Sequence, residues 1–371
     1  MARNHSFVII TPHALQKGQT GAVIMRLLAR TGLTLQAAQI IAADKKFIQT
    51  FADAMAPFHK CPCQPEYIRK SFGATGKKSN PFLALLLHGK DAVKKVNAVV
   101  GSLAPLAGAG TTIRDSFAEV GRDAAGNVVY FEPCVLAPET QKECDTLLPI
   151  LADMASRSKN IVKNAAGADG SGERTLVMIK PENWLRPGIR PGAILDIFTA
   201  TGLFLCGCKI HHISVADALD FYGPVQGALR KKLAPKIAAK AQQFLTEKFS
   251  CPFAVEDVQA IGEQYADDQF FQIIRFMSGN EYDPGDSNSL NTPGKAQVMV
   301  LIFEGKDAVG KIRTVLGPTD PGQADGGTVR GEFGTTIMIN AAHASDSAES
   351  FVREGKILQI DRNDFSSCVT K

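Results

Sequence analysis

A segment near the C-terminus brings together side chains that can do nucleophilic chemistry. A short apolar run, which we expect to form a strand, leads into Asn340, His343, Ser345 and Asp346. A histidine with hydroxyl and carboxylate neighbours can be held in one tautomer and act as a nucleophile. The same residues also fit a plainer interpretation, in which Ser345 or Asp346 begins a helix whose first turn contains Glu349.

The spacing of these residues is that of a known motif. Asn340-Ala-Ala-His343-Ala-Ser345-Asp346-Ser347 resembles the active-site motif of the nucleoside diphosphate kinases, in which Asn precedes the histidine by three residues and Ser-Asp follows it by two. The loop upstream is similar to the family's loop in Leu316, Gly317, Thr319, Asp320, Pro321, Gly327, Thr328, Arg330 and Gly331. The strand ending in Ile179-Lys180-Pro181 resembles the strand that carries the family's active-site lysine. The resemblance covers most of residues 174–354.

This resemblance implies a role for each matching side chain. His343 would carry the phosphate, and Glu354 would orient the imidazole ring. Asn340 would contact the sugar and phosphate region. The phosphates would be held by Lys180, Arg313, Thr319 and Arg330. Tyr222 would lie near the histidine. The base would stack on Phe270, although the match slips by one residue there and Phe271 is the alternative.

The resemblance also implies substrates and a cofactor. Nucleoside triphosphates and diphosphates such as ATP, ADP and GTP would exchange a phosphate in a ping-pong reaction through His343. Lysine and arginine are the side chains that bind polyphosphate and stabilise its charge during transfer. Mg²⁺ would arrive with the nucleotide, bound mainly by phosphate oxygens and water. The sequence contains no G-x-x-x-x-G-K-[ST] pattern, which excludes a Walker-type phosphate loop.

Two segments of the chain repeat each other. His88–Val93 reads HGKDAV and Glu304–Val309 reads EGKDAV, each after an apolar run. The triplet TGL occurs at residues 31–33 and again at 201–203. The offset between the copies grows from 170 residues at TGL to 216 at GKDAV, so the second copy contains an insertion of about 46 residues. The sequence therefore predicts a tandem duplication.

Each copy predicts the same order of elements. Strand, helix, strand, strand, helix and strand form the ferredoxin-like βαββαβ unit, an α+β fold whose antiparallel sheet carries helices on one face. We expect a first domain over residues 1–155, a Ser/Gly/Ala-rich linker over 156–172 and a second domain over 173–371. The insertion, about 223–268, should add a helix from Leu229 to Phe249. It could pack between the domains or close over the nucleotide.

The first copy lacks most of the catalytic set. By the offsets, Lys180 corresponds to Thr11, Arg313 to Asn97 and Thr319 to Leu103. Arg330 keeps its match in Arg114. The histidine position falls near Cys134, for which a buried thiol is the simplest interpretation. We therefore expect the first domain to be a degenerate copy with a structural role.

Composition limits the class of protein. The chain has 371 residues, 45% of them hydrophobic, and 41 basic against 37 acidic side chains give a net charge of +4. This balance does not favour nucleic acid as a specific partner. Eight cysteines and no apolar run of membrane-spanning length indicate a cytoplasmic protein that does not enter the membrane. Two halves in one chain could replace a pair of subunits in a homo-oligomer.

Two further functions remain open at this point. The insertion falls between Tyr222 and Phe270, where the resemblance places the base. A protein altered there could bind nucleotides as a regulator or scaffold with little or no transfer. Alternatively, His343 could pass its phosphate to a protein.

Overall fold

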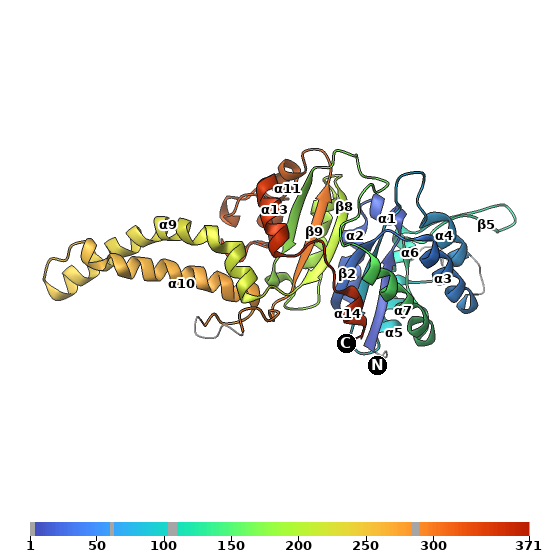
Figure 1. Cartoon of the computed structure of the whole chain (residues 1–371), viewed down its shortest axis with the longest axis horizontal. Coiled ribbons are helices and arrows are strands. Elements are labelled where there is room, and N and C mark those ends of the chain that lie inside the picture. Colours follow the sequence, from blue (N-terminus) through green and yellow to red (C-terminus); the bar gives the residue numbers. More distant parts are fainter. Residues whose placement is uncertain (1–3, 60–62, 103–109, 284–288, 371) are drawn as a thin grey trace. The chain divides into compact units, whose positions relative to one another are not determined.

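The computed structural model describes residues 4–59, 63–102, 110–283 and 289–370 (Figure 1). Its first half contains β1 (His5–Ile10), α1 (Pro12–Gln16), α2 (Thr20–Thr31), β2 (Thr34–Ile41), α3 (Lys45–Met55), the 3₁₀ turn η2 (Ala56–Phe58), α4 (Cys63–Ser71), β3 (Phe82–His88), α5 (Ala92–Val100), α6 (Ile113–Phe117), β4 (Glu119–Arg122), β5 (Val128–Glu132), β6 (Val135–Leu136) and α7 (Gln141–Arg157).

The second half repeats this order with a longer helical segment in the middle. It contains β7 (Arg174–Ile179), the 3₁₀ turn η3 (Pro181–Asn183), α8 (Arg190–Thr199), β8 (Phe204–His211), α9 (Val215–Phe249), η4 (Glu256–Val258), α10 (Gln259–Ser278), β9 (Val298–Glu304), α11 (Ala308–Leu316), η5 (Pro321–Gln323), α12 (Val329–Phe333), β10 (Ala342–Ala344), α13 (Ala348–Ile357) and α14 (Phe365–Thr370).

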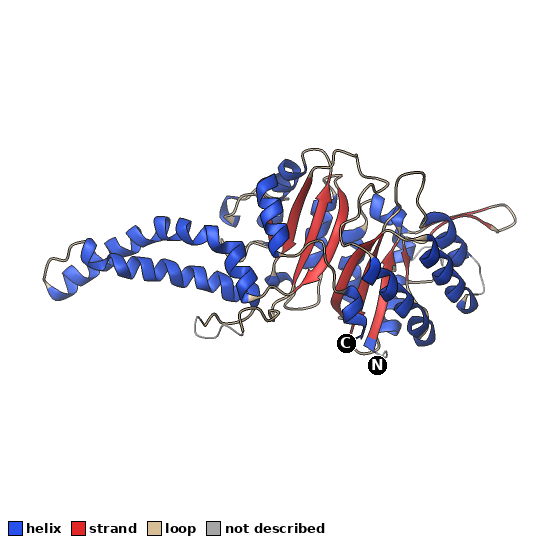
Figure 2. Cartoon of the chain, viewed as in Figure 1, coloured by secondary structure: helices blue, strands red, loops and turns tan. Residues whose placement is uncertain are grey.

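Each half builds a four-stranded antiparallel sheet, drawn in red in Figure 2. The strand order is β2-β3-β1-β6 in the first half and β8-β9-β7-β10 in the second. In both, the first strand lies between the third and the last, which is the order of the ferredoxin-like unit. The predicted fold class is thereby confirmed.

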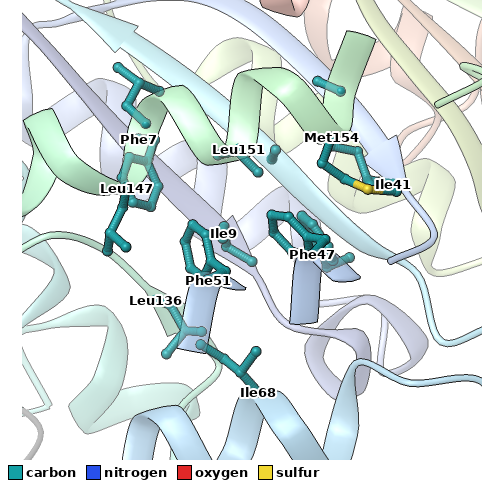
Figure 3. Packing of buried hydrophobic residues seen from close by; sticks show 14 of the residues in the cluster. Phe7, Ile9, Ile41, Phe47, Phe51, Ile68, Leu136, Leu147, Leu151 and Met154 are labelled. Atoms are coloured by element: carbon teal, nitrogen blue, oxygen red, sulfur yellow. The ribbon is translucent and has the colours of Figure 1, made fainter. Parts of the chain in front are cut away.

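Helices cover both faces of the first sheet, whereas the sequence predicted helices on one face. Phe7 and Ile9 of β1 point into a cluster with Phe51 of α3 and Leu147 of α7 (Figure 3). Val8 of the same strand faces the other way and is also fully buried. Burial on both faces explains why β1 is uniformly apolar after Ser6 rather than alternating with polar residues.

The duplication also appears in the backbone. Gly89 and Gly305 share positive φ angles of 146° and 158°, and Gly101 and Gly317 share φ angles of 86° and 82°. Asp91 and Asp307 both adopt the left-handed conformation, with φ of 58° and 55°. Such angles are uncommon for residues other than glycine, so their recurrence at one offset supports the tandem repeat.

Equivalent helices of the two halves pack against each other. Helix α2 contacts α8, and the approach is close enough that two glycines are required. A Cβ atom on Gly21 would lie 2.4 Å from the Asp196 nitrogen, and one on Gly192 would lie 2.2 Å from the Met25 nitrogen. Both neighbours are backbone atoms that cannot move aside independently, so this contact depends on the missing side chains.

The linker and the C-terminal tail meet at the edges of the two sheets. Asn160 donates from Nδ2 to the Ile360 carbonyl at 2.8 Å. The Asn363 amide Nδ2 lies 2.8 Å from the carbonyl of Ala38 in β2 and 3.0 Å from that of Cys208 in β8. Beyond this point Phe365 of α14 is fully buried in the core of the first half. The chain end therefore joins the two halves.

Residues His211–Val298 form a separate compact unit. Figure 1 shows α9 and α10 running side by side as a helical hairpin. The insertion does not add an independent helix from Leu229, as predicted, but lengthens α9 into one helix of 35 residues. Small residues permit close packing, since a Cβ on Gly262 would lie 2.2 Å from the Ala234 carbonyl oxygen. Among the described residues, no helix combines the length and apolar character needed to cross a bilayer.

Replacing Gly21 with alanine should destabilise the α2–α8 contact. The added methyl group would overlap backbone atoms, and overpacking of this kind costs about 1–3 kcal/mol. Chemical denaturation followed by circular dichroism measures the loss. Gly223→Ala is the matched control, because a Cβ there meets nothing within 4 Å and alanine favours a helix. Equal stability of Gly21→Ala and the wild type would contradict the packing described.

Candidate active site

Lys180 lies at the end of β7, inside a polar network. Its ammonium donates to the Asn340 Oδ1 at 2.7 Å and to the Met338 carbonyl at 2.9 Å. The Asn340 amide in turn donates to the Thr319 carbonyl at 3.0 Å. Lys180 and Asn340 are both buried. The network therefore ties the lysine to the two loops that follow α11 and α12.

Burial changes the acidity of this lysine. The pKa of Lys180 is lowered to about 8, mainly by removal from water; the Glu182 carboxylate opposes this shift and the nearby charge of Arg330 adds to it. At neutral pH the side chain is still mostly protonated. Lys180 can thus supply a positive charge at a position shielded from water, where Coulomb attraction to an anion is stronger than in bulk water.

Arg330 is held on α12 by backbone carbonyls. Its guanidinium donates to the Gly317 carbonyl at 3.0 Å and to the Ala342 carbonyl at 3.2 Å. Thr328 caps the helix by accepting from the Gly331 amide. The arginine therefore bridges the loop after α11 and the strand that carries His343.

His343 occupies the middle of the three-residue strand β10, not a position after a strand as predicted. Its Nε2 lies 3.0 Å from the Glu354 Oε2 on α13. Glu354 is buried, which favours its neutral form, but the hydrogen bond with His343 and those from Ser345 and Arg353 outweigh burial and lower its pKa. An ionised carboxylate only accepts, so Nε2 carries the proton and Nδ1 carries the lone pair. The Nδ1 atom of His343 is therefore a nucleophile whose orientation is fixed.

Arg313 and Thr319 lie on the exposed side of this site. The pKa of Asp346 is lowered mainly by a hydrogen bond from the Ser350 hydroxyl, and also by the charges of Arg313 and His343. This places the Arg313 guanidinium near the histidine motif. Thr319 contacts Asn340 through its backbone carbonyl, which leaves the role of its hydroxyl a prediction.

Two residues that the sequence did not assign also shape the site. Ser345 is fully buried and donates from Oγ to the Glu354 Oε2 at 2.7 Å, so it orients the carboxylate instead of capping a helix. The actual cap of α13 is Ser347. Glu182 accepts from the Ala341 amide at 2.8 Å and fixes the residue before β10. In the sequence, the position of Glu182 two residues after Lys180 could have indicated that it lies at the site.

Tyr222 and Phe270 belong to the hairpin unit. Tyr222 lies on α9 and Phe270 on α10, and both are buried. The adjacent Phe271 is partly exposed and stacks on Tyr282, with ring centroids 4.8 Å apart. Their contacts with the sugar or the base of a nucleotide stay a prediction.

The side chains around His343 would bind a metal ion only together with an anionic ligand such as a phosphate. Within the described ranges, no group of three or more His, Cys, Asp or Glu side chains could hold a metal ion. A bare cation would be repelled by the positive charges of Lys180 and Arg330, and the Asn340 amide carries no charge to offset them. A Mg²⁺ ion at this site would therefore depend on phosphate oxygens and water for its ligands.

Strand pairing identifies the positions in the first half that match the site. Ala342 pairs with Ile179 and His343 with Met178, just as Val135 pairs with Ile10 and Leu136 with Ile9. The counterpart of His343 is thus Leu136, two residues beyond the predicted Cys134. Cys134 matches Ala341 instead, and both have positive φ, 60° and 68°. Burial raises the pKa of the Cys134 thiol to about 12, as expected for an inert side chain.

The counterpart of the carboxylate is also apolar. The helix caps Thr140 and Ser347 set the same offset of 207 residues, which matches Glu354 with Leu147. Leu136 and Leu147 are both fully buried in the first core. Only Arg114 keeps its contacts, donating to Gly101 and Val135 carbonyls as Arg330 does to Gly317 and Ala342. Leu103, the expected counterpart of Thr319, lies outside the described residues.

Aromatic side chains lie beside the corresponding positions of the first half. The hairpin β4–β5 has no counterpart in the second half, and its Phe131 ring lies 6.1 Å from the Tyr67 ring of α4. The Tyr67 hydroxyl approaches Glu132 and Thr11, the counterpart of Lys180. Phe131 lines two cavities, one of about 170 Å³ beside Arg114 and one of about 440 Å³ beside Tyr67. The cavity beside Arg114 is below the range of about 300–1,000 Å³ that ligand sites usually offer.

Known proteins similar to this chain share one description. The family model described as nucleoside diphosphate kinase matches residues 4–130 and 287–362. The nucleoside diphosphate kinase of Helicobacter pylori strain Shi470 is 30% identical over 178 residues, which cover 48% of this chain and 88% of that protein. The enzyme of that name from Bdellovibrio bacteriovorus is 29% identical over 182 residues, covering 49% and 89%.

A solved structure shares part of this likeness. The nucleoside diphosphate kinase family protein from Babesia bovis is 25% identical and covers 50% of this chain and 86% of its own, with a TM-score of 0.31.

Lys180 should titrate far below an ordinary lysine. Burial lowers its pKa to about 8, so its ¹³Cε NMR resonance should shift near that pH. A lysine in water titrates above about pH 10, which gives the reference for this shift. Absence of the resonance from Lys180→Arg provides the assignment. Because the folded pKa is below the unfolded one, the lysine's burial penalty is largest below pH 8 and fades as pH rises toward about 10. Titration of Lys180 above pH 10 would contradict its burial.

Proposed function

Because the chain belongs to the nucleoside diphosphate kinase family, we propose that its second half transfers the terminal phosphate of a nucleoside triphosphate to a nucleoside diphosphate. The observation that carries this proposal is the pairing of His343 with Glu354 at 3.0 Å, beside the buried cations Lys180 and Arg330. A nucleophile of fixed tautomer next to charges suited to polyphosphate is what this reaction needs.

In the first step, the His343 Nδ1 lone pair attacks the terminal phosphorus of the triphosphate. The Nδ1–P bond forms as the bond from phosphorus to the bridging oxygen breaks, and the diphosphate leaves with that electron pair. The imidazole becomes cationic, and its Nε2–H remains hydrogen-bonded to the Glu354 carboxylate, which stabilises that charge. Ser345 keeps the carboxylate oriented throughout.

Lys180 and Arg330 stabilise the negative charge that spreads over the transferred group. Asn340 positions the ammonium of Lys180, and Arg313 approaches from the exposed side. We propose that Tyr222 and Phe270, or Phe271 in its place, complete the nucleotide site from the hairpin. Mg²⁺ bound to the phosphates would supply further charge neutralisation. An acceptor diphosphate then reverses the first step.

The degenerate half contributes structure in this proposal. Leu136 and Leu147 bury apolar area where the second half holds a histidine and a glutamate. We propose domains over residues 1–155 and 173–371 joined by the linker 156–172, with the paired halves taking the place of two subunits. Cytoplasmic nucleotides would be the substrates, and any homo-oligomer would be built from these two-domain chains.

His343→Ala should abolish phosphorylation and phosphate exchange together. Removing a covalent nucleophile typically lowers turnover by more than about 10³-fold. Incubation with γ-³²P-ATP should give acid-labile label on the wild type, and ADP should remove it. The control His13→Ala, in the first half, should keep full label. Exchange by His343→Ala would contradict the mechanism.

Nucleotide binding without label in the wild type would favour the regulatory or scaffold alternative. Label that passes to another protein but not to a nucleoside diphosphate would indicate protein phosphorylation.

One nucleotide should bind per chain. In the first half, the lysine and histidine positions are Thr11 and Leu136, and the Tyr67 hydroxyl approaches Thr11. Isothermal titration calorimetry with a non-hydrolysable ATP analogue should therefore give a stoichiometry near one. Substituting Arg330 with methionine should remove this binding, whereas Arg114→Met should not. Two sites of similar affinity would disprove the assignment.

A further inference from the structure

A cavity of about 730 Å³ lies behind α13, away from the residues assigned to His343 chemistry. Its walls come from the linker, the start of β7, α13 and the C-terminal tail, which are brought together where Asn160 bonds to the Ile360 carbonyl. Gly355 forms part of the wall, and a Cβ there would lie 2.6 Å from the Ile360 Cδ1. The volume is within the range of small-molecule sites.

Positive charge dominates the rim of this cavity. Five cations line it against the single carboxylate of Asp361, namely Lys159, Lys163, Arg174, Lys356 and Arg362. Arg174 is already neutralised by Glu304, at 2.6 Å. Over the part of the chain that the structure describes, no carboxylate lies within 4.0 Å of the ammonium groups of the three lysines. Their charge is therefore available to a ligand.

Apolar side chains form the floor between these charges. Ile161 of the linker, Phe351 and Val352 of α13 and Ile360 of the tail all line the cavity. Val352 is 68% exposed and lines the cavity together with the half-buried Phe351 and Ile161. A ligand that covers it would gain hydrophobic free energy of about 25 cal/mol for each Å² buried.

We propose that this cavity binds a small amphiphilic anion, with one acidic head on an apolar body. The head would contact Lys159, Lys163 and Lys356, and the body would cover Phe351 and Val352. Inorganic anions lack the apolar part, and neutral lipids lack the charge. A carboxylate and a phosphate monoester share this chemistry, so fatty acids and alkyl phosphates are the two sources to compare.

Calorimetric titration of the full chain in 150 mM salt tests the proposal. Decanoate and decyl phosphate should each bind with a stoichiometry near one, and their ratio of affinities identifies the source. Acetate, inorganic phosphate and decanol, which carry only the head or only the body, should bind at least about tenfold more weakly. Equal binding of a head or a body alone would overturn the amphiphilic assignment.

Variants locate the site. The double substitution Lys159→Gln and Lys356→Gln should weaken decanoate binding about five- to tenfold, the effect of removing two exposed charge contacts. Val352→Ser should weaken it by removing apolar area. Lys231→Gln with Lys232→Gln on α9 removes the same charge from the hairpin and should leave binding unchanged. Equal affinities for both lysine pairs, or equal losses, would overturn the proposal, because binding would then not occur at this cavity.

Discussion

The antiparallel pairing of β10 with β7 fixes the geometry of the candidate site. Only three residue pairs form, and the central one sets His343 opposite Met178. The backbone of the same short strand accepts from Arg330, and the residue before it accepts from the amide of Lys180. A shift of one residue would turn the imidazole to the other face of the sheet and break both contacts. The register of the β10–β7 pairing therefore positions His343, Lys180 and Arg330 together.

The fold was largely predictable because its signals are local and repeated. The two copies of GKDAV and the glycines after them mark strand ends and turns, and these recur with the same backbone angles. The helices on the second face of each sheet were less evident. The helix α4 is only nine residues long, and its Tyr67 and Ile68 pack in the cluster that contains Phe7 and Leu147, so its helical state depends on tertiary packing.

The site residues with specific side-chain chemistry could be predicted from the sequence. Positions that depend on the register of strand pairing were harder to predict. The sequence indicated His343, Glu354, Lys180, Asn340 and Arg330, and the structure brings these together. It misplaced the first-half counterpart at Cys134, since the hairpin β4–β5 changes the offset from 216 residues at Arg114 to 207 at Val135. Only strand pairing resolves such a change. Ser345 was missed because a serine before a helix resembles a cap until its bond to Glu354 is seen.

The C-terminal tail has a consequence for how the chain is made. Phe365 completes the core of the first half, more than 200 residues after the end of α7. A ribosome that has finished the first half has not yet produced this residue, so that half leaves the exit tunnel with an unfilled place between β2 and α7. Folding during synthesis therefore cannot finish domain by domain. Residues translated long after the first half has emerged complete its core, so a chain that stops before Phe365 would leave that core loosely packed.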